Sequence, residues 1–280
     1  IGANILAARA LMPIIKFTQA QENFSIGKKA SDEIIQFLHI DSDQAEGREL
    51  ADLSGEIAVS NLEFVYPSKK NPVFYDLNFT SLPGEISTIT GPNGSGKTTL
   101  IKILGNILEP TRGQLLIDQI EIAQISTNWL RGQTIYSPQE PKFIDGTLLE
   151  NIIGSISIKN EVLQSILKSV DLLSFINNHE KGLNMRLDNR GEELPLGIRR
   201  RIGHARSLAN NGQIVLFDEP TEGLDKTGKD TFYKLIKNLQ KQNKTIIIST
   251  NDQLIIDISS KLINLNDSFK PTVIVKKDEK

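Results

Sequence analysis

A glycine-rich stretch constrains the fold of this chain more than any other feature of its sequence. It reads Gly91-Pro92-Asn93-Gly94-Ser95-Gly96-Lys97-Thr98-Thr99 and matches the pattern G-x-x-x-x-G-K-[ST]. A β-prone run at 86–90 precedes it, and a helix is predicted from about Lys97 to Leu104. The glycines let successive N–H groups curl around phosphate oxygens, while the helix directs its positive end at the same anion. The stretch therefore predicts a phosphate-binding loop, in which Lys97 reaches the β- and γ-phosphates and Thr98 ligates Mg²⁺. The alternative is a glycine-rich turn with an exposed lysine.

A second candidate site follows an apolar run far along the chain. Residues 214–217 predict a buried strand, and Asp218-Glu219-Pro220 comes directly after it. One carboxylate at such a strand end is suited to hold Mg²⁺, directly or through water, and a second to orient or deprotonate a water. We expect Asp218 to serve the metal and Glu219 the water. The alternative is a polar turn that closes a buried strand.

Strands and helices alternate along the rest of the chain. Strand-like runs lie at 57–66, 73–80, 86–90, 114–117, 133–136, 213–217 and 244–249, and helix-like runs at 146–153, 160–170, 196–209, 226–241 and 252–259. This alternation predicts βαβ units and an α/β fold with a mostly parallel sheet. We expect a helical segment at 1–40, a polar linker at 41–55, a main domain at 56–270 with a helical subdomain at about 146–209, and a charged tail at 271–280.

Composition excludes several classes of protein. The 280 residues include no Cys, which rules out a disulfide framework, a Cys-ligated zinc site and a thiol nucleophile. The formal net charge of −2 argues against nucleic acid as a partner, because nucleic-acid binders usually carry a basic excess. No run reaches the ~18 uninterrupted apolar residues of a membrane-spanning helix. Because the chain begins with Ile, we expect it to be a piece of a longer polypeptide.

Residues from about 56 to 265 resemble the nucleotide-binding domain of ATP-binding cassette (ABC) proteins. Residues 218–221 (Asp-Glu-Pro-Thr) and 222–225 (Glu-Gly-Leu-Asp) are similar to the Walker B segment and the D-loop of that family, and residues 146–152 are similar to an exporter-type sequence. The resemblance implies a P-loop ABC ATPase fold with a mostly parallel core sheet, an antiparallel β subdomain and a helical subdomain. It also implies ATP and Mg²⁺ as cofactors.

The same resemblance assigns roles to individual residues. Tyr66 is similar to the aromatic residue that stacks on adenine, although an ordinary strand tyrosine is the alternative. Gln139 is similar to the Q-loop glutamine, which contacts Mg²⁺ and senses the membrane domain. The candidate catalytic residues are Lys97, Gln139, Glu219 and Asn251, and the candidate metal ligands are Thr98, Gln139 and Asp218. The candidate nucleotide contacts are Tyr66, Gly91, Asn93, Gly94, Ser95, Gly96, Lys97, Thr98 and Thr99.

Two positions depart from the family pattern. The signature loop is usually Leu-Ser-Gly-Gly-Gln, and here it reads Leu194-Pro195-Leu196-Gly197-Ile198. Pro195 offers neither a hydroxyl nor an N–H to the γ-phosphate bound by an opposite subunit, although a helix tolerates it in its first turn. Asn251 replaces the switch histidine; its amide donates to an oxygen, but it is shorter and carries no imidazolium charge. We therefore expect slow hydrolysis unless a different subunit completes the site.

The N-terminus carries a shorter resemblance. Residues 8–13 (Ala-Arg-Ala-Leu-Met-Pro) are similar to the cytoplasmic end of the last transmembrane helix in bacterial type I secretion exporters; the alternative is an amphipathic helix packed on the domain. The resemblance implies an ATPase that powers an ABC exporter of polypeptides or toxins at the cytoplasmic face of the bacterial inner membrane. Its implied partners are the transmembrane domain of the same transporter and a second nucleotide-binding domain. A catalytically weak regulatory subunit of a heterodimeric transporter and a soluble ABC ATPase are the alternatives.

Overall fold

The computed structural model describes residues 12, 16–17, 19–29, 31, 47–265 and 269–276. The chain divides into two units, Ile1–Ala45 and Glu46–Lys280. Every described residue of the first unit is helical. The resemblance at 8–13 lies outside the described residues, except for Met12. In the part of the chain that is described, no helix is both long and apolar enough to cross a membrane.

A six-stranded sheet forms the centre of the second unit, in the order β12-β11-β3-β10-β9-β6. Five strands run parallel, and only β12, at one edge, is antiparallel to its neighbour. Every residue of β9 and β10 is buried, as expected for the middle of a parallel sheet that is covered on both faces. The strands are β3 (Ile86–Thr90), β6 (Thr134–Ser137), β9 (Ile214–Asp218), β10 (Thr245–Ser249), β11 (Lys261–Asn264) and β12 (Thr272–Val275).

One face of this sheet is covered by a helix and by a second, antiparallel sheet. Alternate side chains of a strand point to opposite faces, and on this face Ile214, Leu216 and Ile247 pack in one core cluster with Leu100 and Ile101. The antiparallel sheet has the order β2-β1-β4-β5. The elements here are α2 (Lys97–Leu104), β1 (Ile57–Phe64), β2 (Phe74–Ser81), β4 (Arg112–Ile117) and β5 (Ile120–Glu121), with a short α3 (Thr127–Gly132) beyond them.

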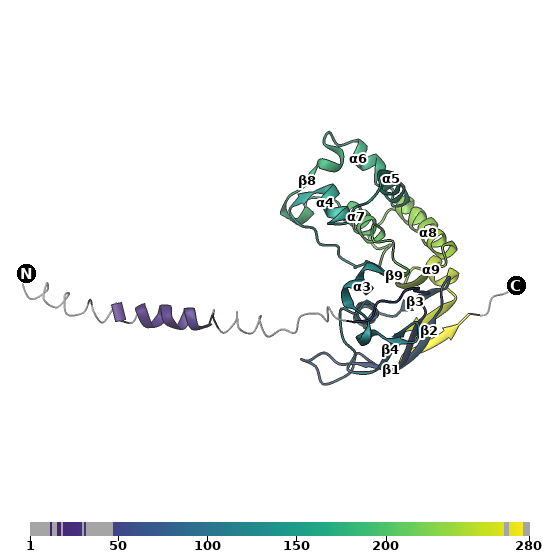
Figure 1. The fold of residues 1–280 in the computed structure, drawn as a ribbon, viewed down its shortest axis with the longest axis horizontal. Coiled ribbons are helices and arrows are strands. Elements are labelled where there is room, and N and C mark those ends of the chain that lie inside the picture. Colours follow the sequence, from purple (N-terminus) through teal and green to yellow (C-terminus); the bar gives the residue numbers. More distant parts are fainter. Residues whose placement is uncertain are drawn as a thin grey trace, which may run out of the picture. The chain divides into compact units, whose positions relative to one another are not determined.

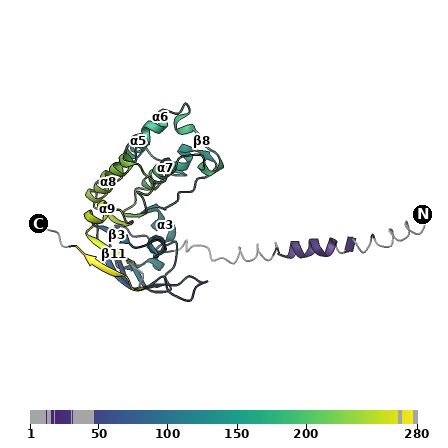
Figure 2. The ribbon, with the colours of Figure 1, turned by 180° about the vertical axis from the view of Figure 1, so that it is seen from behind.

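The opposite face packs against helices (Figures 1 and 2). Val215, Phe217, Ile246 and Ile248 belong to a second core cluster, which contains the buried faces of these helices. Residues 146–209, where a helical subdomain is expected, hold α4 to α7 and the short pair β7–β8. The bounds are β7 (Gly146–Thr147), α4 (Leu148–Ile153), α5 (Asn160–Ser169), α6 (Leu173–Asn177), β8 (Arg186–Leu187), α7 (Leu196–Leu208), α8 (Lys226–Lys241) and α9 (Gln253–Ile258).

Two segments differ from their sequence-based descriptions. Part of the expected tail at 271–280 forms β12, which pairs with β11, because its β-branched run Thr-Val-Ile-Val precedes the charged residues. Part of the expected linker at 41–55 is attached to the domain: Arg48 forms a bridge with Ile125, and Ser54 and Gly55 donate backbone N–H groups to the Asp118 carboxylate. The strands β11 and β12 and the helix α3 were not predicted from the sequence.

Candidate nucleotide-binding site

Four neighbouring strands of the core sheet end at the candidate site. The loop of 91–96 follows β3, Glu219 follows β9, Asn251 lies two residues beyond β10, and Gln139 two beyond β6. Because β3, β10, β9 and β6 are parallel neighbours, their carboxyl ends meet at one edge, where α/β sheets usually bind ligands. The topology therefore brings together residues that are up to 160 positions apart in sequence.

A cavity of about 500 Å³ opens at this edge. Ten of the predicted site residues line it: Tyr66, Asn93, Gly94, Gly96, Lys97, Thr98, Thr99, Gln139, Glu219 and Asn251. Of the other three, Gly91 and Ser95 belong to the same loop, and Asp218 is buried beneath it with 1% of its surface exposed. Three more residues that were not among the predicted site residues also line it: Lys69, Val73 and Glu222.

The loop holds its lysine inward. Lys97 is the first residue of α2, and its Nζ donates to the carbonyl oxygens of Gly91 and Pro92 at 2.9 and 3.3 Å. The same Nζ lies 3.3 Å from Oε1 of Glu219, and both side chains are largely buried. Gly96, the N-cap of α2, has φ 101° and leaves no room for a Cβ beside Val73. The Lys97 ammonium group is thus already held inside the curve of the loop.

Tyr66 lines the same cavity and is hydrogen-bonded to α2, the helix that follows the phosphate loop. Its hydroxyl and that of Thr99 form a hydrogen bond of 2.9 Å. Its ring meets the Phe64 ring edge to face, with 4.8 Å between centroids. These contacts orient the aromatic side chain along the cavity wall.

Glu219 has an unusual backbone conformation. Its φ is 45°, in the left-handed region that side-chain-bearing residues rarely adopt. Its N–H donates to the Ser249 carbonyl oxygen at 2.9 Å, and its own carbonyl accepts from Nη1 of Arg200 at 2.7 Å. Burial raises the pKa of the Glu219 carboxyl, whereas the neighbouring Lys97 acts in the opposite direction.

Asp218 carries a buried carboxylate with one free oxygen. Ser249 donates its hydroxyl to Oδ1, but Oδ2 has no hydrogen-bond partner among the described residues. Leaving a buried carboxylate oxygen unsatisfied is costly. A cation in the cavity would satisfy this oxygen, which suits the metal-binding role expected for Asp218.

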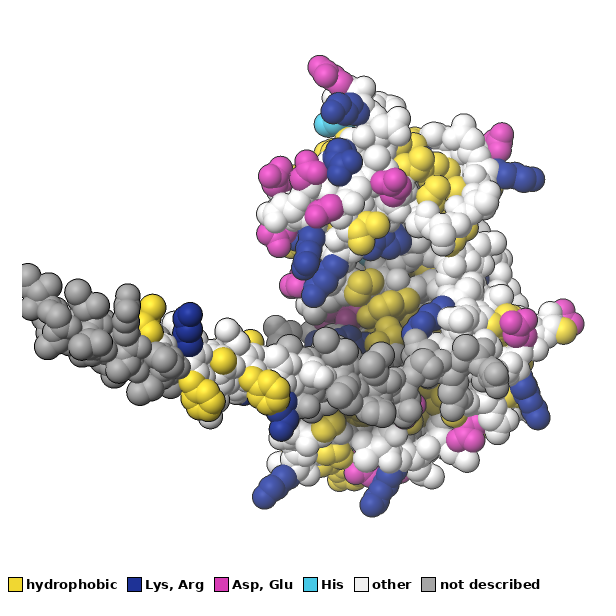
Figure 3. All heavy atoms as spheres, turned by 60° about the vertical axis from the view of Figure 1, so that its left-hand side comes forward, with side chains coloured by type: hydrophobic (Ala, Val, Ile, Leu, Met, Phe, Trp, Pro, Cys, Tyr) yellow, Lys and Arg dark blue, Asp and Glu magenta, His cyan; other side chains and the backbone are white. Residues whose placement is uncertain are grey.

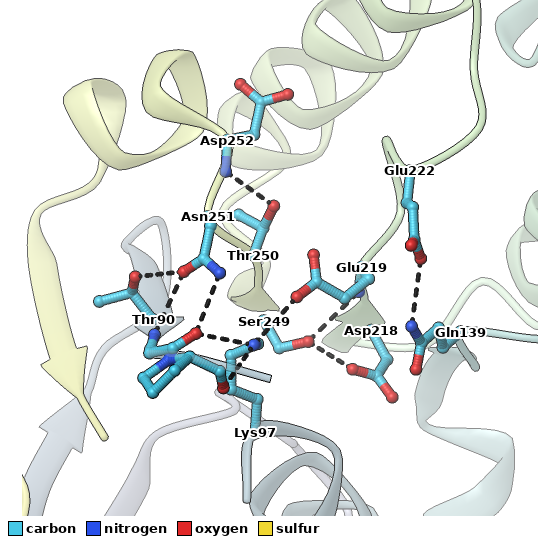
Figure 4. Close-up of polar contacts among 12 residues, drawn as sticks. Thr90, Lys97, Gln139, Asp218, Glu219, Glu222, Ser249, Thr250, Asn251 and Asp252 are labelled. Atoms are coloured by element: carbon cyan, nitrogen blue, oxygen red, sulfur yellow. Dashed lines mark hydrogen bonds and ion pairs between the residues drawn. The ribbon is translucent and has the colours of Figure 1, made fainter. Parts of the chain in front are cut away.

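Gln139 is held by Glu222, which was not among the predicted site residues. Its Nε2 donates to Oε2 of Glu222 at 3.1 Å (Figure 4). The same oxygen accepts from Nη2 of Arg200 at 2.9 Å. The Gln139 hydrogen bond is the main cause that lowers the pKa of Glu222, and Arg200 adds to it. Glu222 therefore links the end of β6 to α7.

The helix α7 also supports the segment 218–222 through a buried histidine. Nε2 of His204 contacts the Pro220 carbonyl at 3.2 Å, and Nδ1 contacts the Ser137 hydroxyl at 2.9 Å. Because a carbonyl only accepts, Nε2 carries the proton and Nδ1 accepts from Ser137. Burial lowers the pKa of His204 to about 4, so the ring is neutral at pH 7.

The altered signature residues lie at the start of α7. Pro195 is its N-cap, one position before the first turn, and its side chain forms no capping hydrogen bond. Leu196 is 40% exposed and lies over Gly223, where an added Cβ would come within 2.8 Å of Leu196. Bulk therefore occupies the surface where the family resemblance implies close backbone approach.

Together, the loop, the strand-end carboxylates and the cavity between them define a P-loop nucleotide-binding domain. A family model described as "ABC transporter" matches residues 74–222, more than half of the chain. The chain belongs to the ABC transporter family, and the fold expected from its motifs is confirmed.

Similar proteins include toxin exporters. The chain is 30% identical over 89% of its length to "Leukotoxin translocation ATP-binding protein LktB" of Pasteurella haemolytica-like sp. (strain 5943B), covering 35% of that protein. It is 28% identical over 96% of its length to "Alpha-hemolysin translocation ATP-binding protein HlyB" of Escherichia coli O157:H7, covering 38%. It is also 30% identical to "ABC transporter B family member 13" of Arabidopsis thaliana over 79% of its length, covering 18%. The chain thus spans well under half of these relatives.

A solved structure supports the fold independently. "Structure of a bacterial Atm1-family ABC exporter with ATP bound" superposes with a TM-score of 0.76 at 22% identity. The match covers 89% of this chain and 44% of that one. At this level of identity the likeness establishes the fold alone.

Proposed function

We propose that the domain binds ATP with Mg²⁺ and hydrolyses it to drive an ABC exporter. Lys97 and Glu219 form an ion pair at one cavity, next to the buried Asp218, and this arrangement carries the proposal. Lys97 supplies the charge that holds the β- and γ-phosphates, and Glu219 accepts a proton from the attacking water. The raised pKa of the buried Glu219 carboxyl favours this proton transfer.

The residues present fit Mg²⁺. The Thr98 hydroxyl, the Gln139 amide oxygen and Asp218 Oδ2 are oxygen donors, which this hard cation prefers. The unpartnered Oδ2 supports the assignment of Asp218 as one of its ligands. When bound, Mg²⁺ would neutralise charge on the transferring phosphate. Tyr66 would stack on adenine, and the loop from Gly91 to Thr99 would hold the phosphates.

The proposed partners are the transmembrane domain of the same transporter and a second nucleotide-binding domain. A second, more apolar cavity of about 510 Å³ supports a contact with the first of these, because it is lined by the exposed side chains of Ile107, Ile144 and Ile156. Figure 3 shows hydrophobic side chains in a hollow between the two parts of the domain. Tyr136, in β6, lines this cavity three residues before Gln139, which offers a short path to the nucleotide site.

The names of LktB and HlyB support toxin or polypeptide cargo. With such cargo, the domain would work at the cytoplasmic face of a bacterial inner membrane. We expect residues 1–40 to lead from the last transmembrane helix and 41–55 to connect to the ATPase domain. Hydrophobic spans encoded upstream of Ile1 would support this organisation, and a soluble domain there would refute it.

Binding and hydrolysis test the proposal directly. We expect calorimetry to show MgATP binding to the chain, and Lys97→Ala to weaken it by at least about tenfold, because a charge-assisted phosphate contact is lost. Glu219→Gln should retain binding and lose turnover. The control is Lys102→Ala, in the last turn of the same helix and outside the cavity. Failure of the unaltered chain to bind ATP would refute the proposal.

We further propose that turnover needs a different second subunit with an intact signature. Pro195 and Leu196 would impair the site of whichever subunit faces α7, so two copies of this chain would impair each other. The purified chain at high concentration should therefore hydrolyse ATP slowly. Robust turnover that Glu219→Gln abolishes would overturn the requirement for a different partner.

A further inference from the structure

The side chain of Asn251 is turned toward the phosphate loop in this structure. Its Oδ1 accepts from the Thr90 hydroxyl at 2.7 Å and from the Gly91 N–H at 3.2 Å, and its Nδ2 donates to the Gly91 carbonyl at 2.9 Å (Figure 4). One carboxamide thus binds both backbone groups of the residue that opens the loop.

These bonds continue the pairing between β10 and β3 beyond the last strand residue. Thr250 still donates its N–H to the Ile89 carbonyl at 2.9 Å, and the next residue uses its side chain instead of its backbone. On the other side of β3, the N–H of Leu265 donates to the Thr90 carbonyl at 2.8 Å. The entrance to the loop is therefore held from both sides.

The chemistry of this contact suits an amide and not an imidazole. A carboxamide presents a donor and an acceptor side by side, which matches the N–H and C=O of one extended residue. In a neutral imidazole the donor and the acceptor are separate ring nitrogens that point in different directions. Asn251 therefore makes a paired contact that the histidine expected at this position would not reproduce.

Gly91 is a position where such support matters. Its φ is 151°, and an added Cβ would collide with the Leu265 carbonyl, so the backbone here is closely confined. The Gly91 carbonyl also accepts from Lys97 Nζ at 2.9 Å. When Lys97 turns to a phosphate, the Nδ2 of Asn251 remains as a partner, and the carbonyl is not left unsatisfied.

We propose that Asn251 is a positioning residue of the phosphate loop, which fixes the Gly91 peptide group for any nucleotide instead of sensing the γ-phosphate. This inference rests on the proposed nucleotide site. It predicts that loss of Asn251 weakens the binding of ADP and of ATP alike, because both nucleotides place phosphates in the loop. A γ-phosphate contact would affect ATP alone.

Calorimetric dissociation constants for ADP and ATP test this in the purified chain. We expect Asn251→Ala to weaken the binding of both nucleotides by a similar factor of about tenfold, since the two hydrogen bonds that hold the Gly91 backbone are lost. Thr90→Val, which removes the hydroxyl that orients Oδ1, should weaken both by a smaller common factor. Gln253→Ala, two residues further on, is the matched control, because among the described residues its side chain bonds within α9, to Asp257.

A second measurement does not depend on nucleotide. Amide hydrogen exchange at Gly91 in the nucleotide-free chain should accelerate in Asn251→Ala, because the Gly91 N–H loses its acceptor, Oδ1 of Asn251. Loss of ATP affinity with ADP unaffected, or unaltered affinities and unaltered Gly91 exchange, would overturn the proposal. Failure of the unaltered chain to bind either nucleotide, with Gly91 exchange still accelerated, would instead refute the proposed function.

Discussion

Arg200 donates a hydrogen bond from Nη1 to the backbone carbonyl of Glu219 at 2.7 Å. The guanidinium is buried, with 5% of its side chain exposed, and its other terminal nitrogen is paired with Glu222. One residue of α7 therefore holds both the left-handed backbone of Glu219 and the carboxylate that binds Gln139. Its planar fork makes two directed contacts at once, which an ammonium group does not reproduce.

We predict that Arg200→Lys slows hydrolysis more than it weakens binding. A lysine keeps the charge but loses one of the two contacts, so the Glu219 carboxylate is less well placed for its water. Single-turnover hydrolysis of bound ATP should slow by about tenfold, the equivalent of one hydrogen bond, while the ATP dissociation constant stays within about twofold. Arg190→Lys, on an exposed turn, is the control. A parallel loss of affinity would show that Arg200 merely supports the fold.

Glu219→Gln should bind ATP more tightly than the unaltered chain. Lys97 and Glu219 form an ion pair of 3.3 Å in the nucleotide-free site, and this pair must open when Lys97 turns to phosphate. Loss of this ion pair should lower the ATP dissociation constant by about threefold, which is within the range of free energies of a partly screened ion pair. Glu222→Gln removes a charge from the same cavity without touching Lys97, so it should give a smaller gain in the same titration. Equal gains in ATP affinity for the two variants would instead point to general repulsion between the carboxylates and the phosphates.

His204 should make the domain less stable at acidic pH. Its pKa is about 4 in the folded chain against 6.5 in the unfolded one, so the unfolded state binds more protons between these values. Stability is therefore full above pH 6.5 and falls as the pH drops toward 4, by about 2 kcal/mol at pH 5. Urea unfolding at pH 7.5 and 5 should show this loss, and His204→Gln should flatten it. His179→Gln, on the exposed surface, should leave the slope unchanged.

Restoring the signature should raise turnover. Pro195→Ser with Leu196→Gly returns a hydroxyl and removes the side chain that lies over Gly223. If two copies of this chain pair, steady-state ATP hydrolysis by the double variant should exceed that of the unaltered chain by about tenfold or more, as one restored charge-assisted contact allows. Glu219→Gln in the same background should abolish the gain. No increase would mean that the signature does not limit the rate.

Local motifs were sufficient to predict the strand and the helix that flank the phosphate loop. The strand Ile86–Thr90 and the helix Lys97–Leu104 are found with the bounds that the motif predicted, because glycine conformation and helix capping act over a few residues. The Arg200–Glu222–Gln139 network was missed, since Gln139 and Glu222 are 83 positions apart and meet only in the folded chain. The strands β11 and β12 are short, so their patterns are weak. A signal for α3 was present in Ser126, which caps it.

The helix α7 joins the exposed signature residues to the interior of the candidate site through one continuous element. Its first turn carries the signature residues. Four positions beyond Leu196, Arg200 holds the carbonyl of Glu219, and one turn later His204 holds the carbonyl of Pro220. At 1.5 Å per residue these points lie within about 12 Å along the axis. We expect a displacement of the exposed tip at Leu196 to be passed along the helix to Arg200, which holds the Glu219 carbonyl. A partner that binds at this tip should therefore change the orientation of the Glu219 side chain.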